Sequence, residues 1–433
     1  MAGARGLRFF GGAEPPLLNR YWRTLWAARA DVREMFPEPE GANAKWFAQW
    51  RREHVEADER AAGLEPGSHA AAPPRPGVNL VGYLDSGRGL GEAGRQIRAA
   101  LAQAGIETAP VAVPAEADGL AAALGSLAAE DHPHDLNLFC LNADMMPAAV
   151  AAAGPKFFAG RRSVGLWFWE VSAFPERWLR SFDALDEVWV ASGHVAAALR
   201  PVSPVPVRTV RMPIVPAPPA RASRAELGMP EGFCFLFVFD YRSVFARKNP
   251  LGAVRAFCRA FAPGEGPSLA IKSVAGESFP AEREELRAAA AERPEIHLLE
   301  GTVSAAEKNA MIASCDCYLS LHRSEGLGLT IGEAMYFGRP TIATGYSGNL
   351  DFMTAWNSFP VRFELTPVGP GAGPYPAWAE WAEPDLDHAA KLMRRVHRRP
   401  RLAAVRGRWA AAGIRRTHSP AAAARIVRRR VRR

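Results

Sequence analysis

The strongest constraint on the fold is an alternation of short β-rich runs with longer helical runs, which the chain shows twice. The β-rich runs of the first series are Val78–Leu84, Thr108–Val113, Leu136–Leu141, Val164–Trp169 and Glu187–Val190. Those of the second series are Cys234–Phe239, Leu269–Ser273, Ile296–Leu299, Cys317–Leu321 and Thr341–Thr344. Strands that alternate with helices pair in parallel and are covered by those helices, so we predict an α/β protein with two Rossmann-like domains.

Proline-rich stretches separate these series from each other and from the region before them. Ala70–Gly77 follows a region with aromatic residues at helical spacing, and Pro201–Ala222 lies between the two series. The predicted divisions are a helical N-terminal extension with a linker, an N-terminal domain, a C-terminal domain and a set of basic helices, over residues 1–76, 77–215, 216–383 and 384–433. In open α/β sheets ligands bind beyond the carboxyl ends of the strands, so we expect the site between the domains.

Positive charge is concentrated near one end of the sequence. The net charge is +8, and residues 391–433 contain fifteen arginines, one lysine and no acidic residue. The rest of the chain is therefore net acidic, and we expect no nucleic-acid partner. We expect the basic segment to lie against an anionic membrane surface, at the inner face of the membrane. The alternative is a solvated set of helices that packs on the body of the protein.

The cysteines and the apolar runs indicate a cytoplasmic protein. The five cysteines are odd in number and have no paired metal spacing, which is typical of reduced thiols. No apolar run approaches the ~20 residues needed to span a bilayer. The N-terminus also lacks the apolar stretch of a secretory signal.

The stretch Leu319–Met353 is the strongest candidate for ligand chemistry. A predicted strand is followed by a polar loop and by a helix that starts near residues 328–330, and a helix N-terminus favours an anion. Glu325 lies in the loop and Glu333 about one turn into the helix. Two carboxylates beside an anion are unfavourable unless they accept hydrogen bonds from sugar hydroxyls. The alternative is that Glu325 caps the helix and Glu333 is solvated.

A second candidate is a basic loop after the first predicted strand of the second series. Asn249 is a natural helix N-cap, and Pro250 suits the first helical position. Arg242, Arg247 and Lys248 therefore gather where a strand ends and a helix begins, a place where a diphosphate would be neutralised. The alternative is a solvated basic loop.

A third candidate is the glycine motif that starts with Gly89 and Gly91 and ends with Gly94, after a predicted strand. It satisfies GxGxxG and supplies an alternative function, an NAD(P)-dependent oxidoreductase. A dinucleotide fingerprint also needs an acidic residue at the end of the second strand. Glu107 precedes that strand and Glu116 follows it, so neither fits the fingerprint.

Two carboxylates just beyond strand ends, Asp144 and Glu170, are candidates to orient or deprotonate a hydroxyl. The alternative is that each caps the following turn. We predict no metal site, because His132 and His134 lie in a turn and the candidate loops contain no Asp-x-Asp.

The spacing Glu325–x7–Glu333 within SEGLGLTIGEAMYFGRPTIAT resembles the E-x7-E motif of the retaining GT-B glycosyltransferases of family 4, also described as group 1. The resemblance covers most of residues 78–365 and is densest in the second half. It implies that Glu333 hydrogen-bonds the ribose of a nucleotide-sugar and that Glu325 meets hydroxyls of the donor sugar. The start of the helix is predicted to bind the donor through Gly326, Leu327, Gly328, Leu329 and Thr330.

The resemblance also implies roles for the other two candidates. Lys248 would hold the leaving diphosphate, and the spacing leaves open whether Arg242 or Arg247 is its partner. The glycine-rich loop would face the donor phosphates and the acceptor. The chain departs from the family pattern, because many members carry a His near the reacting centre where this chain has Trp-Phe-Trp before Glu170.

These observations together predict a metal-independent glycosyltransferase with a GT-B fold. It would move a sugar from a nucleotide diphosphate donor to a hydroxyl of a glycan or a lipid-linked acceptor, with retention, in surface polysaccharide or glycolipid assembly. No cofactor is expected besides this donor substrate. The alternatives are the NAD(P)-dependent oxidoreductase and a non-catalytic glycosyltransferase-like binding protein.

Overall fold

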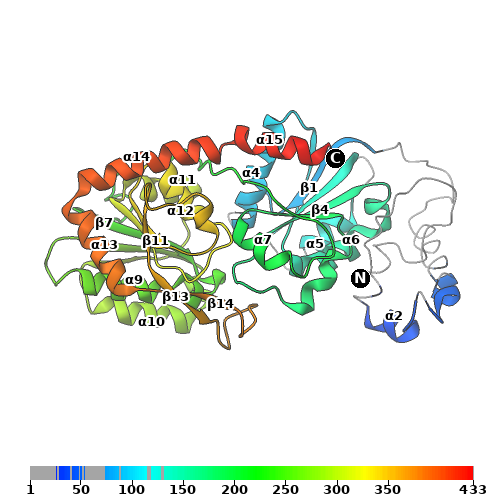
Figure 1. Ribbon diagram of the computed structural model, residues 1–433, viewed down its shortest axis with the longest axis horizontal. Coiled ribbons are helices and arrows are strands. Elements are labelled where there is room, and N and C mark those ends of the chain that lie inside the picture. Colours follow the sequence, from blue (N-terminus) through cyan, green and yellow to red (C-terminus); the bar gives the residue numbers. More distant parts are fainter. Residues whose placement is uncertain are drawn as a thin grey trace.

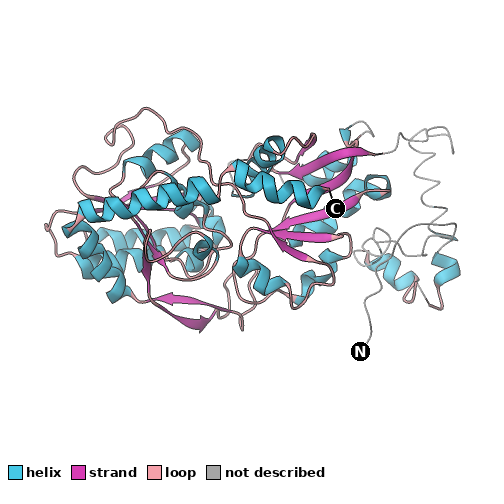
Figure 2. Cartoon of the chain, turned by 45° about the horizontal axis from the view of Figure 1, so that its top comes forward, coloured by secondary structure: helices cyan, strands magenta, loops and turns pink. Residues whose placement is uncertain are grey.

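The computed structural model describes residues 26, 29–39, 41–47, 49–50, 53, 74–86, 89–114, 119–127 and 131–432. Two α/β domains lie side by side, each built on a six-stranded sheet whose strands all pair in parallel (Figure 1). Helices cover the sheets (Figure 2). The predicted fold class is therefore confirmed.

The sheet of the first domain has the strand order β2-β1-β3-β4-β5-β6. Its strands are β1 (Arg75–Gly82), β2 (Thr108–Ala112), β3 (His134–Cys140), β4 (Arg162–Trp167), β5 (Glu187–Val190) and β6 (Val207–Thr209). The accompanying helices are α4 (Gly89–Gln103), α5 (Gly119–Gly125), η2 (Ala143–Met145), α6 (Met146–Phe158), η3 (Glu176–Phe182) and α7 (Gly193–Leu199). The central strands are buried on both faces, which explains their nearly continuous apolar sequences.

The sheet of the second domain has the order β12-β11-β10-β7-β8-β9. Its strands are β7 (Cys234–Asp240), β8 (Ser268–Val274), β9 (Ile296–Leu299), β10 (Cys317–Ser320), β11 (Thr341–Thr344) and β12 (Phe359–Val361). Its helices are η4 (Tyr241–Ser243), α8 (Phe245–Lys248), α9 (Pro250–Ala260), η5 (Gly276–Ser278), α10 (Pro280–Ala291), α11 (Ala305–Ser314), α12 (Leu329–Tyr336) and η6 (Gly348–Asp351). The predicted cap at the start of α9 is present, because the Asn249 side chain accepts a hydrogen bond from the Gly252 N–H.

Every predicted strand is present, and the structure adds short ones that the sequence pattern did not indicate. β6 lies within the proline-rich stretch between the domains and forms one edge of the first sheet. β12 forms the edge of the second sheet that lies opposite to β9. An antiparallel hairpin, β13 (Phe363–Pro367) and β14 (Glu380–Pro384), follows β12. Most of the predicted N-terminal extension lies outside the described residues, but α2 (Ala30–Met35) is described, and Val32 joins the core of the first domain.

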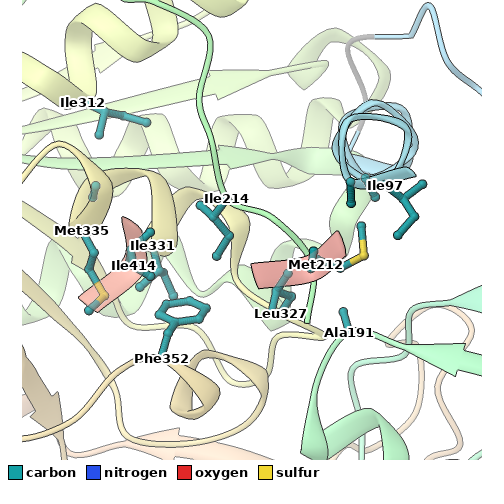
Figure 3. Packing of buried hydrophobic residues seen from close by; sticks show 14 of the residues in the cluster. Ile97, Ala191, Met212, Ile214, Ile312, Leu327, Ile331, Met335, Phe352 and Ile414 are labelled. Atoms are coloured by element: carbon teal, nitrogen blue, oxygen red, sulfur yellow. The ribbon is translucent and has the colours of Figure 1, made fainter. Parts of the chain in front are cut away.

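The segment between the domains is anchored by buried apolar side chains. Met212 and Ile214 are each 1% exposed. They belong to a cluster that contains Ile97 of α4 and Ile331 of α12, so it spans both domains (Figure 3). In that view Ile214 lies between Ile331 of the second domain and Ile97 of the first. The domains therefore share a continuous apolar contact rather than only a flexible connection.

Three helices follow the hairpin, and they are divided between the domains. In the second domain, α13 (Leu386–Arg398) packs against α9, and α14 (Pro400–Thr417) packs against α12. The chain then returns to the first domain, where α15 (Pro420–Val431) packs on α4 (Figure 1). There the Arg428 guanidinium donates to the carbonyl oxygen of Ala104 at 2.9 Å. Within the described part of the chain, no helix is long and apolar enough to cross a membrane.

Candidate active site

The loop between β10 and α12 is held against the first domain. The Ser192 hydroxyl donates to the Gly326 carbonyl oxygen at 2.6 Å, and the Ser324 hydroxyl donates to the carbonyl oxygen of Glu170. A Cβ atom on Gly326 would lie 3.2 Å from the carbonyl oxygen of Trp169. Glycine therefore permits the close approach of the two backbones. The loop that carries Glu325 lies at the boundary between the domains, where the sequence predicted the site.

Glu325 lies between the two cations of the basic loop. Its Oε1 atom is 2.5 Å from Nζ of Lys248, and its Oε2 atom is 3.4 Å from the Arg247 guanidinium. Burial alone would raise the pKa of Glu325, but the neighbouring charges of Lys248 and Arg247 bring this pKa down to about 2. Burial lowers the pKa of Lys248, and Glu325 opposes that effect. At neutral pH the site thus holds an ionised carboxylate between two cations.

His322 supports this cluster as a neutral side chain. It is fully buried, with Nδ1 3.0 Å from the Ser320 hydroxyl and Nε2 3.1 Å from Oδ1 of Asn349. Burial lowers the pKa of His322 to about 4. The sequence analysis assigned this His no role in the site, although it lies only two residues beyond the end of β10.

Glu333 lies in the first turns of α12 and is 4% exposed. The Lys308 ammonium group, from α11, donates to both of its carboxylate oxygens at 2.6 Å. Burial raises the pKa of Glu333, Lys308 opposes this shift, and Glu92 of α4 adds to it. Glu92 lies at the start of α4 in the other domain, so its charge acts on Glu333 across the domain boundary. Gly328 precedes α12 with a φ of 83°, a conformation that favours glycine.

The two candidate arginines occupy different environments. The Arg247 side chain is buried, and its guanidinium donates to the Ser324 carbonyl oxygen at 2.8 Å, so it holds the Glu325 loop. The Arg242 side chain is 43% exposed and pairs with Asp240 at 2.8 Å. The structure therefore brings Arg247, but not Arg242, into contact with Glu325.

On the side of the first domain, Glu170 follows β4 and has partners in both domains. Its Oε2 atom accepts a hydrogen bond from the Tyr375 hydroxyl at 2.9 Å. Its carbonyl oxygen lies 2.7 Å from Nε2 of His194, in addition to its contact with Ser324. Burial raises the pKa of Asp144, and the nearby charge of Glu170 adds to this shift. The charges of the two carboxylates predicted on the acceptor side thus act on each other, and the backbone of Glu170 contacts the Glu325 loop.

Two of the three glycines of the GxGxxG motif, Gly91 and Gly94, have packing roles. A Cβ atom on Gly91 would lie 2.5 Å from the carbonyl oxygen of Tyr83, and one on Gly94 would lie 2.7 Å from the Leu84 side chain. Gly89 has no heavy atom within 4 Å of such a position. Close packing of α4 on the turn after β1 explains Gly91 and Gly94 without a bound dinucleotide.

Lys308 and Tyr375 also belong to the site, and the sequence analysis missed both. Lys308 follows the capping box of Ser304 and Glu307, a pattern that could have placed it in the first turn of a helix. Tyr375 lies in the connection of the hairpin, where no regular pattern indicated a role. In the described part of the chain, no group of three or more His, Cys, Asp or Glu side chains is arranged to hold a metal ion.

Comparisons with known proteins agree with this architecture. Residues 242–359 match the family model described as "Glycosyl transferases group 1". No curated protein sequence matches the chain. The matched segment lies within the second domain and contains both Glu325 and Glu333.

Solved structures extend the similarity to most of the chain. Sucrose-phosphate synthase from Thermosynechococcus elongatus is 16% identical with a TM-score of 0.62, over 83% of this chain and 98% of that one. Anabaena HepE, solved with UDP and glucose, is 14% identical with a TM-score of 0.58, over 83% and 100%. The α,α-trehalose 6-phosphate synthase from Burkholderia multivorans is 15% identical with a TM-score of 0.53, over 72% and 75%. At these identities the likeness shows the fold, which is the GT-B fold of glycosyltransferases.

Proposed function

We propose that this protein is a retaining GT-B glycosyltransferase of the family 4 type, which moves a sugar from a nucleotide diphosphate donor to a hydroxyl group. One observation carries the proposal. Glu325 and Glu333 follow β10 at the boundary between the domains, and each is buried against a lysine from a different helix. This is where an open α/β sheet binds its ligand.

The donor is proposed to lie along the start of α12. Glu333 accepts hydrogen bonds from the ribose hydroxyls, and Glu325 accepts them from the donor sugar. Lys248 binds the diphosphate with Arg242 or Arg247, and the backbone from Gly326 to Thr330 completes the site. Negative charge builds on the diphosphate as the glycosidic bond breaks, so cations placed there stabilise the transition state more than the ground state.

Glu170 is proposed to orient or deprotonate the acceptor hydroxyl on the opposite side of the site. Its carboxylate belongs to the domain that faces the Glu325 loop, and Ser324 contacts its backbone. The new glycosidic bond forms on the face from which the diphosphate leaves, so the anomeric configuration is retained. Proton NMR of the first product formed distinguishes retention from inversion. For a metal-independent reaction, we expect full activity in the presence of EDTA.

The acceptor is proposed to be a glycan or a lipid-linked glycan in surface polysaccharide or glycolipid assembly. The protein is proposed to bind this acceptor at the cytoplasmic face of a membrane. The support is an exposed basic stripe on α14, formed by Arg401, Arg408, Arg416 and the 55% exposed Trp409. Each charge near an anionic surface contributes about 1 kcal/mol.

Vesicle sedimentation tests this membrane contact. Anionic vesicles should retain the wild type but not the variant with Arg401, Arg408 and Arg416 changed to Gln. The matched control changes three exposed arginines outside α14 to Gln, namely Arg200, Arg208 and Arg255. Equal retention of both variants would contradict the membrane contact.

Ligand-induced thermal shifts test the proposed donor. The panel contains UDP-, GDP-, ADP- and dTDP-sugars together with NADH and NADPH. A ligand at 100 times its dissociation constant stabilises the folded state by about 2.7 kcal/mol, which such a measurement detects. A shift with a sugar nucleotide, followed by transfer or donor hydrolysis, is expected. A shift only with NADH or NADPH would indicate the oxidoreductase, and sugar-nucleotide binding without turnover would indicate the non-catalytic alternative.

A further inference from the structure

The β13–β14 hairpin of the second domain extends to the first domain. Its two strands lie at the lower edge of the molecule, next to the junction of the domains (Figures 1 and 2). The connection between the strands, residues 368–379, packs on the segment that follows β4. Val368, Tyr375 and Ala379 of this connection belong to the same apolar cluster as Trp169 and Phe174 of the first domain.

Hydrogen bonds fix the hairpin on this segment. The Glu380 N–H donates to the Ser172 hydroxyl at 2.9 Å, and the Ser172 N–H donates to the Glu380 carbonyl oxygen at 3.4 Å. The Arg177 guanidinium donates to the Pro374 carbonyl oxygen at 2.6 Å. The second half of the connection is therefore held on both sides of Tyr375, at Pro374 and at Glu380.

Tyr375 contributes one polar group to the interior of this interface. Its ring lies edge-on to Trp169, with 5.2 Å between centroids, and its side chain is buried. Its hydroxyl donates to Oε2 of Glu170 at 2.9 Å. Burial raises the pKa of Tyr375 well above its usual value, so the hydroxyl stays a neutral donor at physiological pH.

The other end of the hairpin is attached to the loop that carries Glu325. The Ala382 N–H donates to the Arg323 carbonyl oxygen at 2.9 Å, and Nε of Arg323 donates to Glu383 at 2.6 Å. The Arg323 guanidinium also lies 5.4 Å from the centroid of Trp381. The hairpin thus connects Glu170 with the donor loop of the other domain.

We infer that Tyr375 is a positioning residue, which holds the Glu170 carboxylate toward the acceptor through a hydrogen bond delivered from the opposite domain. The inference rests on the proposed function and adds to it a residue outside the matched family segment. Because Tyr375 occupies Oε2, the Oε1 atom is left to receive the acceptor hydroxyl.

The charges around Glu170 explain why a neutral donor is needed. Arg247 and Lys248 attract its carboxylate, and Asp144 repels it. His194 contacts its backbone. Without Tyr375 the carboxylate is free to turn toward the two cations, which would remove it from the acceptor and occupy the groups that hold the diphosphate. A tyrosine hydroxyl fixes the carboxylate without adding a further positive charge.

Steady-state kinetics of Tyr375→Phe, Glu170→Gln and the double variant test the inference. Tyr375→Phe keeps the ring on Trp169 and removes only the hydroxyl, so we expect kcat to fall about tenfold, as for one lost hydrogen bond. The donor KM and the dissociation constant of the bare nucleotide should stay within about twofold of wild type. The double variant should be no slower than Glu170→Gln alone, because the hydroxyl acts through Glu170. Tyr336→Phe removes a hydroxyl from the far end of α12 and should behave as wild type.

The outcomes separate the inference from the proposed function. Wild-type kcat in Tyr375→Phe, or independent effects that multiply in the double variant, would overturn the inference while the transferase activity of the wild type stands. A parallel loss of melting temperature and nucleotide affinity in Tyr375→Phe would show a merely structural role and would also overturn it. If the wild type binds no sugar nucleotide, the proposed function fails, and the assignment of Tyr375 fails with it.

Discussion

Lys248 and Glu325 form an ion pair with 2.5 Å between Nζ and Oε1, although they lie seventy-seven positions apart in the sequence. Both side chains are largely buried, and Arg247 adds a second cation at 3.4 Å. A donor diphosphate would give Lys248 a second anionic partner. The same lysine would therefore stabilise the empty site through Glu325 and bind the donor through its diphosphate.

Glu325→Gln should lower the free energy of unfolding by about 3 kcal/mol, because it leaves two buried cations without their counter-charge. Urea denaturation measures this loss. Asp387→Asn is the matched control, since it breaks the pair with Arg259 at 3.0 Å between side chains that are at least half exposed. That control should cost less than about 1 kcal/mol. Similar losses in the two variants would contradict the buried cluster.

Glu333→Ala should weaken binding of a bare nucleoside diphosphate by about 1–3 kcal/mol, as for a lost hydrogen bond to a charged group. Glu325→Gln should not weaken that affinity, because it leaves Lys248 and Arg247 free to pair with the diphosphate, and it should reduce sugar transfer instead, because its proposed partner is the donor sugar. Isothermal titration calorimetry with the diphosphate alone separates the two roles. Identical losses of affinity would refute this division.

Lys308→Met should make nucleotide binding dependent on pH. Burial already raises the pKa of Glu333, and Lys308 is the charge that opposes this shift. Without Lys308 the pKa rises further, so the carboxylate becomes protonated as the pH falls, and it no longer accepts two hydrogen bonds from the ribose. Calorimetry at pH 8.5 and pH 6 should show weaker binding at the lower pH in this variant. The control variant Lys391→Met, which changes an exposed lysine outside the site, should bind the nucleotide equally well at both pH values.

Lys248→Ala should reduce kcat by about 100-fold, comparable to the loss of one preorganised electrostatic group. The donor KM should change much less, because the charge that Lys248 stabilises develops in the transition state. Arg242→Ala and Arg247→Ala complete the experiment. Arg247→Ala should also lower the melting temperature, since its buried guanidinium holds the Ser324 carbonyl, whereas Arg242→Ala should not. Unchanged turnover in Lys248→Ala would remove the basic loop from the active site.

The stability of the fold should fall as the pH drops from about 6.5 toward 4. Burial lowers the pKa of both His322 and His418 to about 4. A lowered histidine pKa means that the folded state resists protonation, so stability is fully present above the unfolded pKa and is lost as the pH falls toward the folded one. A shift of this size corresponds to about 2–3 kcal/mol per group. His418→Gln, outside the site, should flatten the pH dependence of the unfolding free energy in this window, and an unchanged slope would contradict the assignment.

The sequence pattern predicted the parts of the fold whose cause is local. The apolar runs predicted the buried strands, and the helix cap expected at Asn249 predicted that the basic loop lies at the start of a helix. β6 and β12 were missed because each has only three residues. The hairpin was missed because each of its strands has only five residues and neither shows a clear alternation of buried and exposed positions.

The candidate site shows the same limit. The spacing of Glu325 and Glu333 is readable because both lie on one loop and helix. The partners of the site carboxylates cannot be read from the sequence in this way. Lys308 lies twenty-five positions from Glu333, and Tyr375 lies 205 positions from Glu170, in the other domain. The first contact depends on how α11 and α12 pack within the second domain, and the second depends on how the two domains meet. No local period encodes either.

The return of α15 to α4 has a consequence for the order in which the protein is made. Ala100 and Leu101 of α4 are buried in a cluster with Ala423 and Val427 of α15. Residues 89–103 leave the ribosome more than three hundred residues before 420–431, and synthesis adds only about 5–20 residues per second. During that interval the first domain exposes an apolar helix face, and only the arrival of α15 completes its core. The domain that is synthesised first is therefore the one that finishes folding last.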